Sequence, residues 1–188
     1  MIKLHLGCGK ICLPGYVNVD IQSGPGVDVV ADLRRLPWSD GTIDLLYSCS
    51  AIEHFGRREW VAVLQEWARV LKPGGMLRLS TADFDAAVAR YAQTGNLPEL
   101  LGLLIGGQKD DYDWHGMIFN FKELSKGLLE AGFGDIRRYD WRETEIGKLG
   151  IDDYSQAYLP HMDKLNGRLM MLNVEAVRTI ETQRSARE

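Results

Sequence analysis

The chain has 188 residues, with 22 Lys and Arg against 26 Asp and Glu and no long basic run. This length suits one α/β domain with a well-buried core, and the mildly acidic balance argues against a nucleic-acid partner. No apolar run could cross a bilayer and the first residues lead straight into a strand, so we expect a cytoplasmic protein with no membrane partner. Three cysteines are too few for a disulfide framework, and we expect them to be reduced and to hold no metal: Cys8, Cys12 and Cys49.

A strand, a glycine turn and a second strand open the chain. Residues 3–6 and 17–20 are predicted as strands, and Gly7-Cys8-Gly9 follows the first one at once. Glycines let a backbone approach a ligand closely, and the acid that ends the second strand, Asp20, can accept hydrogen bonds from two ribose hydroxyls. The pattern indicates a nucleoside site, and an ordinary tight turn is the alternative.

The rest of the chain alternates strand-like and helix-like segments, which is typical of a mostly parallel sheet with helices on both faces. Strands are predicted over residues 27–31, 43–48, 76–80, 136–141 and 169–177, and helices over 57–71, 83–93 and 98–105. A further helix is predicted from a capping box at Asn120 and Glu123 to a stop at Gly132. The long stretch 142–167 is interpreted as a lid or dimer surface. We expect one domain over residues 1–182 and a frayed polar tail over 183–188.

Four segments carry a more specific pattern. They are Leu4–Gly9, then Asp20, then Ala31–Leu46 and finally Arg69–Leu77. In the last two, an acid, a Leu-Pro-Trp turn and a buried strand are followed, after one helix, by Leu-Lys-Pro-Gly-Gly. The set resembles the class I S-adenosylmethionine-dependent methyltransferases, in particular a small, type 11-like subgroup associated with polysaccharide biosynthesis. The resemblance implies a Rossmann-like, doubly wound α/β sheet of seven strands, mostly parallel with one antiparallel strand near the C-terminus.

The resemblance also implies that S-adenosylmethionine binds across the carboxyl ends of the first strands. Asp20 would hold the ribose hydroxyls and Asp32 would address the adenine edge. The residues implied to contact the cofactor are His5, Gly7, Cys8, Gly9, Asp20, Ile21, Asp32, Leu33, Ser48 and Cys49. Structural alternatives stay open: Asp20 as a solvated strand end, Asp32 as a turn cap, and Ser48 and Ser50 as packing or capping residues.

Two departures from the family pattern concern this end of the sheet. Only ten residues separate Gly9 from Asp20, fewer than a crossover with a full helix normally uses. The first helix is therefore predicted to be a turn or a loop, in agreement with Pro14-Gly15. His5 stands where many members carry an acid, and it is interpreted either as a weaker contact to the cofactor or as a buried structural histidine.

Methyl transfer from a sulfonium needs placement, and a hydroxyl acceptor also needs a base. The candidate bases are His115, His54 and Asp83. His115 is favoured because residues 111–117 are rich in Tyr, Trp and Asp, which suits a loop that holds a polar, ring-shaped ligand. The residues predicted to bind substrate are Ser50, Tyr112, Asp113 and Trp114. The alternatives are a loop that only covers the sheet edge, an Asp83 that only caps a helix, and a His54 that orients the loop beneath the cofactor.

The sequence thus predicts an S-adenosylmethionine-dependent methyltransferase that acts on a small molecule or saccharide intermediate by O-methylation, releases S-adenosylhomocysteine and is a monomer or homodimer. The saccharide rests on analogy, because the His-Gly-Met-Ile-Phe-Asn segment at residues 115–120 resembles enzymes of polysaccharide synthesis. A non-catalytic module that only binds S-adenosylmethionine is one alternative. An NAD-dependent oxidoreductase is disfavoured, because Cys12 stands where the third glycine of Gly-x-Gly-x-x-Gly would be.

Overall fold

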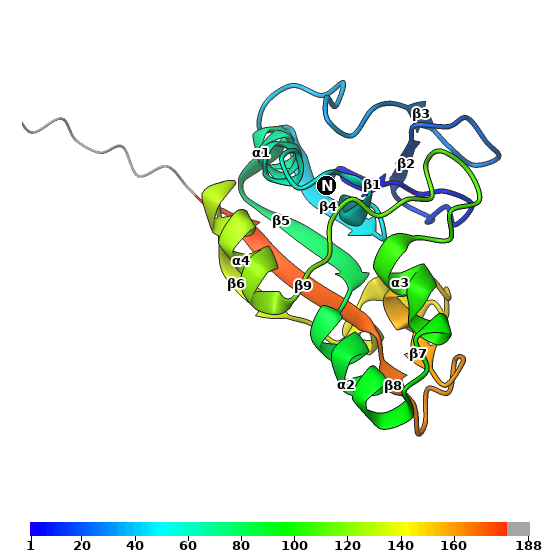
Figure 1. Cartoon of the computed structure of the whole chain (residues 1–188). Helices are drawn as coiled ribbons and strands as arrows, with labels where there is room; N and C mark the ends of the chain where they lie inside the picture. Colours follow the sequence, from blue (N-terminus) through cyan, green and yellow to red (C-terminus); the bar gives the residue numbers. More distant parts are fainter. Residues whose placement is uncertain (180–188) are drawn as a thin grey trace, which may run out of the picture.

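The computed structural model describes residues 1–179, so the predicted domain end at residue 182 and the tail over 183–188 lie outside the described residues. Its centre is a seven-stranded sheet in the order β3-β2-β1-β4-β5-β9-β6 (Figure 1). All neighbouring strands run parallel except at β9, which is antiparallel to both of its neighbours. The strands are β1 (Lys3–Leu6), β2 (Val17–Asp20), β3 (Val29–Val30), β4 (Ile43–Cys49), β5 (Leu71–Ala82), β6 (Phe133–Arg138) and β9 (Met171–Arg178). The predicted fold class is confirmed.

The first four α-helices correspond to the predicted ones with shifted ends, and α5 was not predicted. The helices are α1 (Trp60–Val70), α2 (Phe84–Thr94), α3 (Leu101–Ile105), α4 (Phe121–Glu130) and α5 (Glu145–Lys148), with short 3-10 turns η1 (Ile52–His54), η2 (Pro98–Leu100), η3 (Trp141–Glu143) and η4 (Tyr154–Gln156). A small hairpin of β7 (Tyr158–Leu159) and β8 (Arg168–Leu169) follows η4. Asn120 caps α4 as predicted, since its side chain accepts a hydrogen bond from the Glu123 amide at 2.9 Å. In the described residues, no helix is long and apolar enough to span a membrane.

One face of the sheet is covered by α1 and α4 (Figure 1). Alternate strand residues such as Leu4, Leu46 and Leu79 pack here against Leu64 of α1 and Leu128 of α4. These five side chains are fully or almost fully buried, and they form the main core of the domain. The burial of this apolar face is the main force that holds the sheet to its helices.

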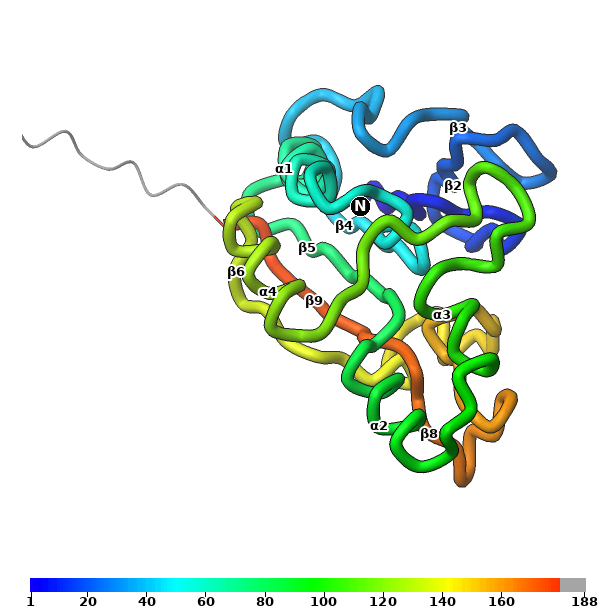
Figure 2. The backbone as a smooth tube through the Cα atoms, in the orientation of Figure 1, coloured from blue at the N-terminus to red at the C-terminus, as the bar shows by residue number. Residues whose placement is uncertain are grey.

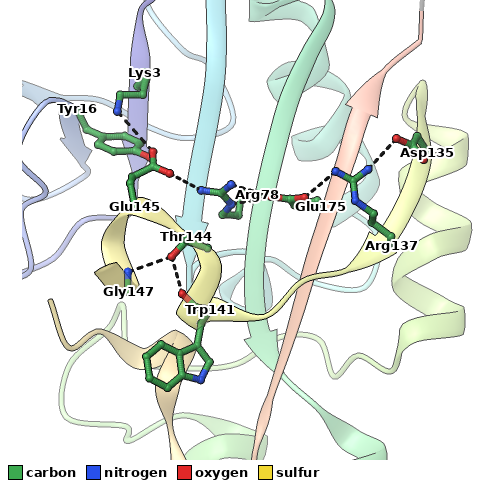
Figure 3. Close-up of polar contacts among 10 residues, drawn as sticks. All are labelled: Lys3, Tyr16, Arg78, Asp135, Arg137, Trp141, Thr144, Glu145, Gly147 and Glu175. Carbon is green, nitrogen blue, oxygen red and sulfur yellow. Dashed lines mark hydrogen bonds and ion pairs between the residues drawn. The ribbon is translucent and has the colours of Figure 1, made fainter. Parts of the chain in front are cut away.

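The other face of the sheet is covered by residues 141–157, so the first part of the stretch 142–167 is packed against the sheet. The interpretation of this stretch as a lid or dimer surface stays a prediction. Residues 141–157 contain η3, α5 and η4, and Ile146 of α5 is buried against Leu13, Tyr16 and Tyr47. The carboxylate of Glu145 in this segment pairs with Lys3 of β1 and Arg78 of β5, whereas the Thr144 hydroxyl bonds to the backbone of its own segment (Figure 3). These helices have only three or four residues each, too few for a periodic pattern of apolar residues to be visible in the sequence.

The connection from β1 to β2 contains no helix in the described residues, as its ten-residue length requires. Its Gly7 amide donates to the Val19 carbonyl of β2 at 2.9 Å, and turns inside it are closed by bonds from the Ile11 amide to the Cys8 carbonyl at 2.9 Å and from the Tyr16 amide to the Leu13 carbonyl at 3.4 Å. The segment between α3 and α4 returns past η1, where the amides of Gly116 and Met117 donate to the Glu53 carbonyl at 2.8 and 3.1 Å (Figure 2). These two loops border the carboxyl ends of β1 and β4.

Candidate active site

The glycines after β1 let two loops meet at the edge of the sheet. Gly7 has a φ of +70°, and a Cβ there would lie 2.7 Å from the Cβ of Ala51, which follows β4. Only glycine fits such an approach without displacing the neighbouring loop. Gly9 also has a positive φ, of +51°, but the space around its missing Cβ is open. The turn is therefore tightly packed at Gly7, against the residue that follows β4, and open at Gly9, where the cofactor is predicted to bind.

Asp20 ends β2 beside this turn. One carboxylate oxygen accepts a hydrogen bond from the Gly9 amide at 2.8 Å, and the other accepts one from the Gln22 amide at 2.9 Å. A carboxylate has about four acceptor positions, so this side chain can hold the glycine turn and still accept from a ligand hydroxyl. Ile21, the next residue, is 39 % exposed.

Asp32 and Leu33 lie in the turn after β3, and both have partners within the protein. The Asp32 carboxylate accepts a hydrogen bond from the Arg34 amide at 2.9 Å and pairs with its guanidinium, and this pairing with Arg34 lowers the pKa of Asp32. The side chain of Leu33 is buried, and its carbonyl accepts from the Trp67 indole at 3.1 Å. The turn-cap role that the sequence left open for Asp32 is therefore present in the structure.

The end of β4 contains strained and unpartnered polar groups. Ser50 has a φ of +52°, which is uncommon for a residue with a side chain. Among the described residues, three buried oxygens near this point have no hydrogen-bond partner: Ser48 Oγ, Glu53 Oε2 and Thr81 Oγ1. Burial raises the pKa of Glu53 and so favours its neutral form. Such atoms are rare in native proteins, and strain of this kind gathers at functional sites.

Glu53 is absent from the residues that the sequence identified as site candidates. A glutamate in a short turn after a strand looks like a solvated surface residue, so the sequence contains no signal for its burial. The side chain of Cys49, which was predicted to lie near the sulfonium, packs in the core of the second face, where burial raises the pKa of its thiol. Cys8 is also buried, and burial raises the pKa of its thiol to about 12.

His54 and His115 lie together at this edge, with ring centroids 5.0 Å apart. The ring nitrogens of His54 lie 3.1 Å from the Ser50 carbonyl and 3.0 Å from the Trp114 carbonyl, so His54 joins the end of β4 to the loop before α4. Nδ1 of His115 lies 3.1 Å from the carbonyl of Leu103, which can only accept, so the neutral ring keeps a lone pair on Nε2. Burial, and then the charge of His54, lower the pKa of His115.

Three of the predicted substrate residues lie in the loop before α4, where one is bonded to the loop itself and two are exposed. The Asp113 carboxylate accepts hydrogen bonds from the amides of Gly107 and Lys109 at 3.1 and 3.4 Å, so it closes its own loop. Tyr112 and Trp114 are 52 % and 53 % exposed, which leaves their rings free to contact a ligand.

His5 and Asp83 are engaged in structural contacts. His5 is buried on the second face, with Nδ1 3.3 Å from Asn18 Oδ1, and burial lowers its pKa to about 4. This environment favours the structural alternative for His5. Asp83 caps α2 by accepting from the Asp85 amide at 3.1 Å and pairs with Arg138 at 3.1 Å. The capping alternative for Asp83 is therefore present as well.

Comparisons with known proteins agree with this arrangement. Residues 14–79 match a family model described as a methyltransferase domain, which begins after the glycine turn. Demethylmenaquinone methyltransferases of Staphylococcus aureus and Staphylococcus epidermidis are 30 % and 29 % identical to the chain over 145 and 143 residues. Each alignment covers 70 % of this chain and 54 % of the relative, so the chain spans about half the length of these curated relatives.

Solved structures share the fold. A protein from Thermotoga maritima, described as an S-adenosylmethionine-dependent and possible histamine N-methyltransferase, has a TM-score of 0.61 at 15 % identity and covers 95 % of this chain and 82 % of its own. The 1,6-didemethyltoxoflavin-N1-methyltransferase of Burkholderia thailandensis, solved with 1,6-didemethyltoxoflavin and S-adenosylhomocysteine, has a TM-score of 0.58 at 15 % identity and covers 95 % and 71 %. The chain thus has the Rossmann-like methyltransferase fold. Its similarity to methyltransferases therefore consists of the domain matched over residues 14–79, the partial alignment with the curated relatives and the shared fold.

Proposed function

We propose that this protein transfers a methyl group from S-adenosylmethionine to a hydroxyl of a small molecule. The observation that carries the proposal is the convergence, at one edge of the sheet, of the glycine turn after β1, the carboxylate of Asp20 and the paired rings of His54 and His115. In open α/β sheets, ligands bind at the carboxyl ends of the strands, where these groups lie.

The residues at this edge fit the cofactor. The open space at Gly9 admits a ligand close to the backbone, and Asp20 offers acceptor positions for a ribose diol. The unpartnered oxygens of Ser48 and Glu53 lie at the adjacent end of β4. S-adenosylmethionine supplies an activated methyl group on a sulfonium, and positioning of the acceptor can then provide much of the rate enhancement.

His115 supports a hydroxyl acceptor, because this kind of acceptor must lose a proton during transfer. Its Nδ1 is committed to the Leu103 carbonyl, so Nε2 is available to accept that proton. The exposed rings of Tyr112 and Trp114 beside it can stack on the face of a ring. A saccharide ring and a phenolic or quinol ring both have a face that can stack in this way and hydroxyls at the rim of that face. The relatives named as demethylmenaquinone methyltransferases support a small-molecule acceptor.

Calorimetric titration with S-adenosylmethionine, S-adenosylhomocysteine and NAD tests the cofactor. We expect the first two to bind and NAD to give no heat. Asp20→Asn should weaken S-adenosylhomocysteine binding about tenfold or more, because hydrogen bonds to a charged group contribute about 1.5–3 kcal/mol. Asp40→Asn is the control, since Asp40 is an exposed carboxylate that pairs with Arg69. Binding of NAD alone would replace the proposal with the oxidoreductase alternative.

A screen of methyl acceptors then separates an enzyme from a binding module. Sugar nucleotides, simple saccharides and hydroxylated aromatic rings are incubated with methyl-labelled S-adenosylmethionine, and labelled products are isolated. Label on a saccharide oxygen supports the finer proposal, and label on an aromatic hydroxyl retains O-methylation with a different acceptor. Tight cofactor binding with no turnover on any of these acceptors would favour the non-catalytic module.

A further inference from the structure

The loop that carries the glycine turn is supported from the second face of the sheet. Residues 7–16 form this loop, which replaces the helix that a crossover normally uses. Its backbone has contacts with Asn18, whose side-chain oxygen accepts from the Leu13 amide at 2.7 Å. Its last side chain, Tyr16, is buried on the second face beside Leu13 and Ile146. The glycine turn is held at one end by Asp20 and β2, and the groups that hold Tyr16 fix the other end of the same loop.

Tyr16 is held by a charged partner far away in the sequence. Its hydroxyl donates to Oε1 of Glu145 at 2.5 Å, and the ammonium of Lys3 lies 4.4 Å from the centre of its ring. The same ammonium lies 3.5 Å from Oε1 of Glu145 (Figure 3). Burial and the hydrogen bond to Glu145 raise the pKa of Tyr16, so the hydroxyl keeps the proton that it donates.

Glu145 is fixed in turn at the start of α5. Thr144 caps this short helix, since its hydroxyl accepts from the Gly147 amide at 3.0 Å. The second oxygen of Glu145 accepts from the Arg78 guanidinium of β5 at 3.0 Å. Burial alone would raise the pKa of Glu145, but the Tyr16 hydroxyl and Arg78 outweigh it and lower the pKa to about 2. The carboxylate is therefore charged throughout the neutral range, and the anchor stays intact.

We propose that Tyr16 and Glu145 are positioning residues for the cofactor, which act by fixing the loop that places Gly7 to Gly9 against the ligand. This inference rests on the proposed function. In this inference, residues 141–157 support the loop in the way that a first helix would otherwise do. Glu145 and Ile146 of this segment contact the loop from the second face of the sheet. Small displacements of a binding loop by a distant group can cost large factors in binding or rate.

The matched pair Tyr16→Phe and Tyr139→Phe tests the proposal. Each variant loses one buried phenolic hydroxyl, but that of Tyr139 has no hydrogen-bond partner in the part of the chain that the structure describes. Tyr16→Phe should weaken S-adenosylhomocysteine binding by about three- to tenfold, and Tyr139→Phe should not. With an acceptor in hand, Tyr16→Phe should raise KM for S-adenosylmethionine and leave kcat at saturation unchanged.

A readout without ligand completes the test. In hydrogen exchange of the free protein, the amides of residues 7–13 should exchange faster in Tyr16→Phe than in the wild type or in Tyr139→Phe. Glu145→Gln should show the same direction, since it loses the charge that pairs with Arg78. A Tyr16→Phe variant with wild-type affinity and wild-type exchange would overturn the inference. Failure of the wild type itself to bind S-adenosylhomocysteine would instead overturn the proposed function.

Discussion

At the scale of single residues, the two histidines at the carboxyl edge have different tasks. Within residues 1–179, His54 has both ring nitrogens near carbonyl oxygens, whereas His115 has one nitrogen without such a partner. A general base needs a free lone pair within reach of the acceptor proton. His115 meets this requirement, and its lowered pKa keeps the ring neutral at lower pH than an ordinary histidine.

His115→Asn should reduce kcat by about 10²–10⁴-fold, the usual contribution of general base catalysis, and leave S-adenosylhomocysteine affinity unchanged. In the wild type, activity should rise with pH as His115 loses its proton. Because burial and His54 lower that pKa, the acidic limb of kcat/KM should lie below the value of 6.5 for a free histidine. Rate profiles from pH 4.5 to 8 measure both effects. His161→Asn, at an exposed histidine, is the control, and full activity in His115→Asn would exclude the role.

At the scale of elements, the close packing of α1 against α4 requires a glycine at position 127. A Cβ on Gly127 in α4 would lie 1.9 Å from a ring carbon of Trp60 in α1, whereas a Cβ on Gly102 in α3 meets nothing within 4 Å. Replacement of a helical glycine by alanine normally stabilises a helix by about 1 kcal/mol. At Gly127, the contact between α1 and α4 should make the replacement by alanine destabilising, whereas at Gly102 it should remain stabilising.

Gly127→Ala should lower the free energy of unfolding by about 1–3 kcal/mol, the usual cost of overpacking a core. Gly102→Ala should raise it by about 0.5–1 kcal/mol. Urea unfolding of both variants, followed by far-ultraviolet circular dichroism, measures the difference. If the two variants shift stability in the same direction, α1 and α4 do not pack as closely as this arrangement requires.

The same scale shows which elements the sequence could predict. Strands with clear alternation and helices with a cap, such as α4 after Asn120, were predicted to within a few residues, because their signals are local. The predicted strand 27–31 is confirmed only in part, as β3 at Val29–Val30, and the stretch 142–167, for which no element was predicted, contains α5, η4 and β7. Those segments owe their structure to tertiary contacts, such as that of Ile146 with Tyr16, and these contacts have no local periodicity.

At the scale of the whole molecule, the sequence predicted the motifs of the candidate site but not the distant residues that hold those motifs in place. The glycine turn and Asp20 were visible because their chemistry is contained in a few adjacent residues. The supports of the site depend on residues far apart in the sequence. Asp83 forms an ion pair with Arg138, Glu145 accepts a hydrogen bond from Tyr16, and Glu53 is buried by the surrounding fold. A single sequence carries no signal for such pairs, because each partner alone resembles an ordinary surface charge.

On the second face of the sheet, pairs of residues that are distant in the sequence form one continuous row of polar side chains. The row crosses five strands in register, from β1 to β6: His5, Tyr47, Arg78, Glu175 and Arg137. At its centre, Arg78 and Glu175 are cross-strand partners 2.7 Å apart, with side chains 12 % and 10 % exposed (Figure 3). A buried ion pair contributes little net stability, but removal of one partner leaves an uncompensated charge.

Arg78→Met should therefore cost about 3 kcal/mol in the free energy of unfolding, because Glu175 and Glu145 both lose a cationic partner and Glu175 keeps only the half-exposed Arg137. The double variant Arg78→Met with Glu175→Met should cost less than the single one, since an apolar pair of similar volume replaces the ion pair. Urea unfolding of the wild type, both single variants and the double variant at pH 7 completes the cycle. Additive losses would mean that each side chain stabilises the protein independently, and the row would then not act as one network across the sheet.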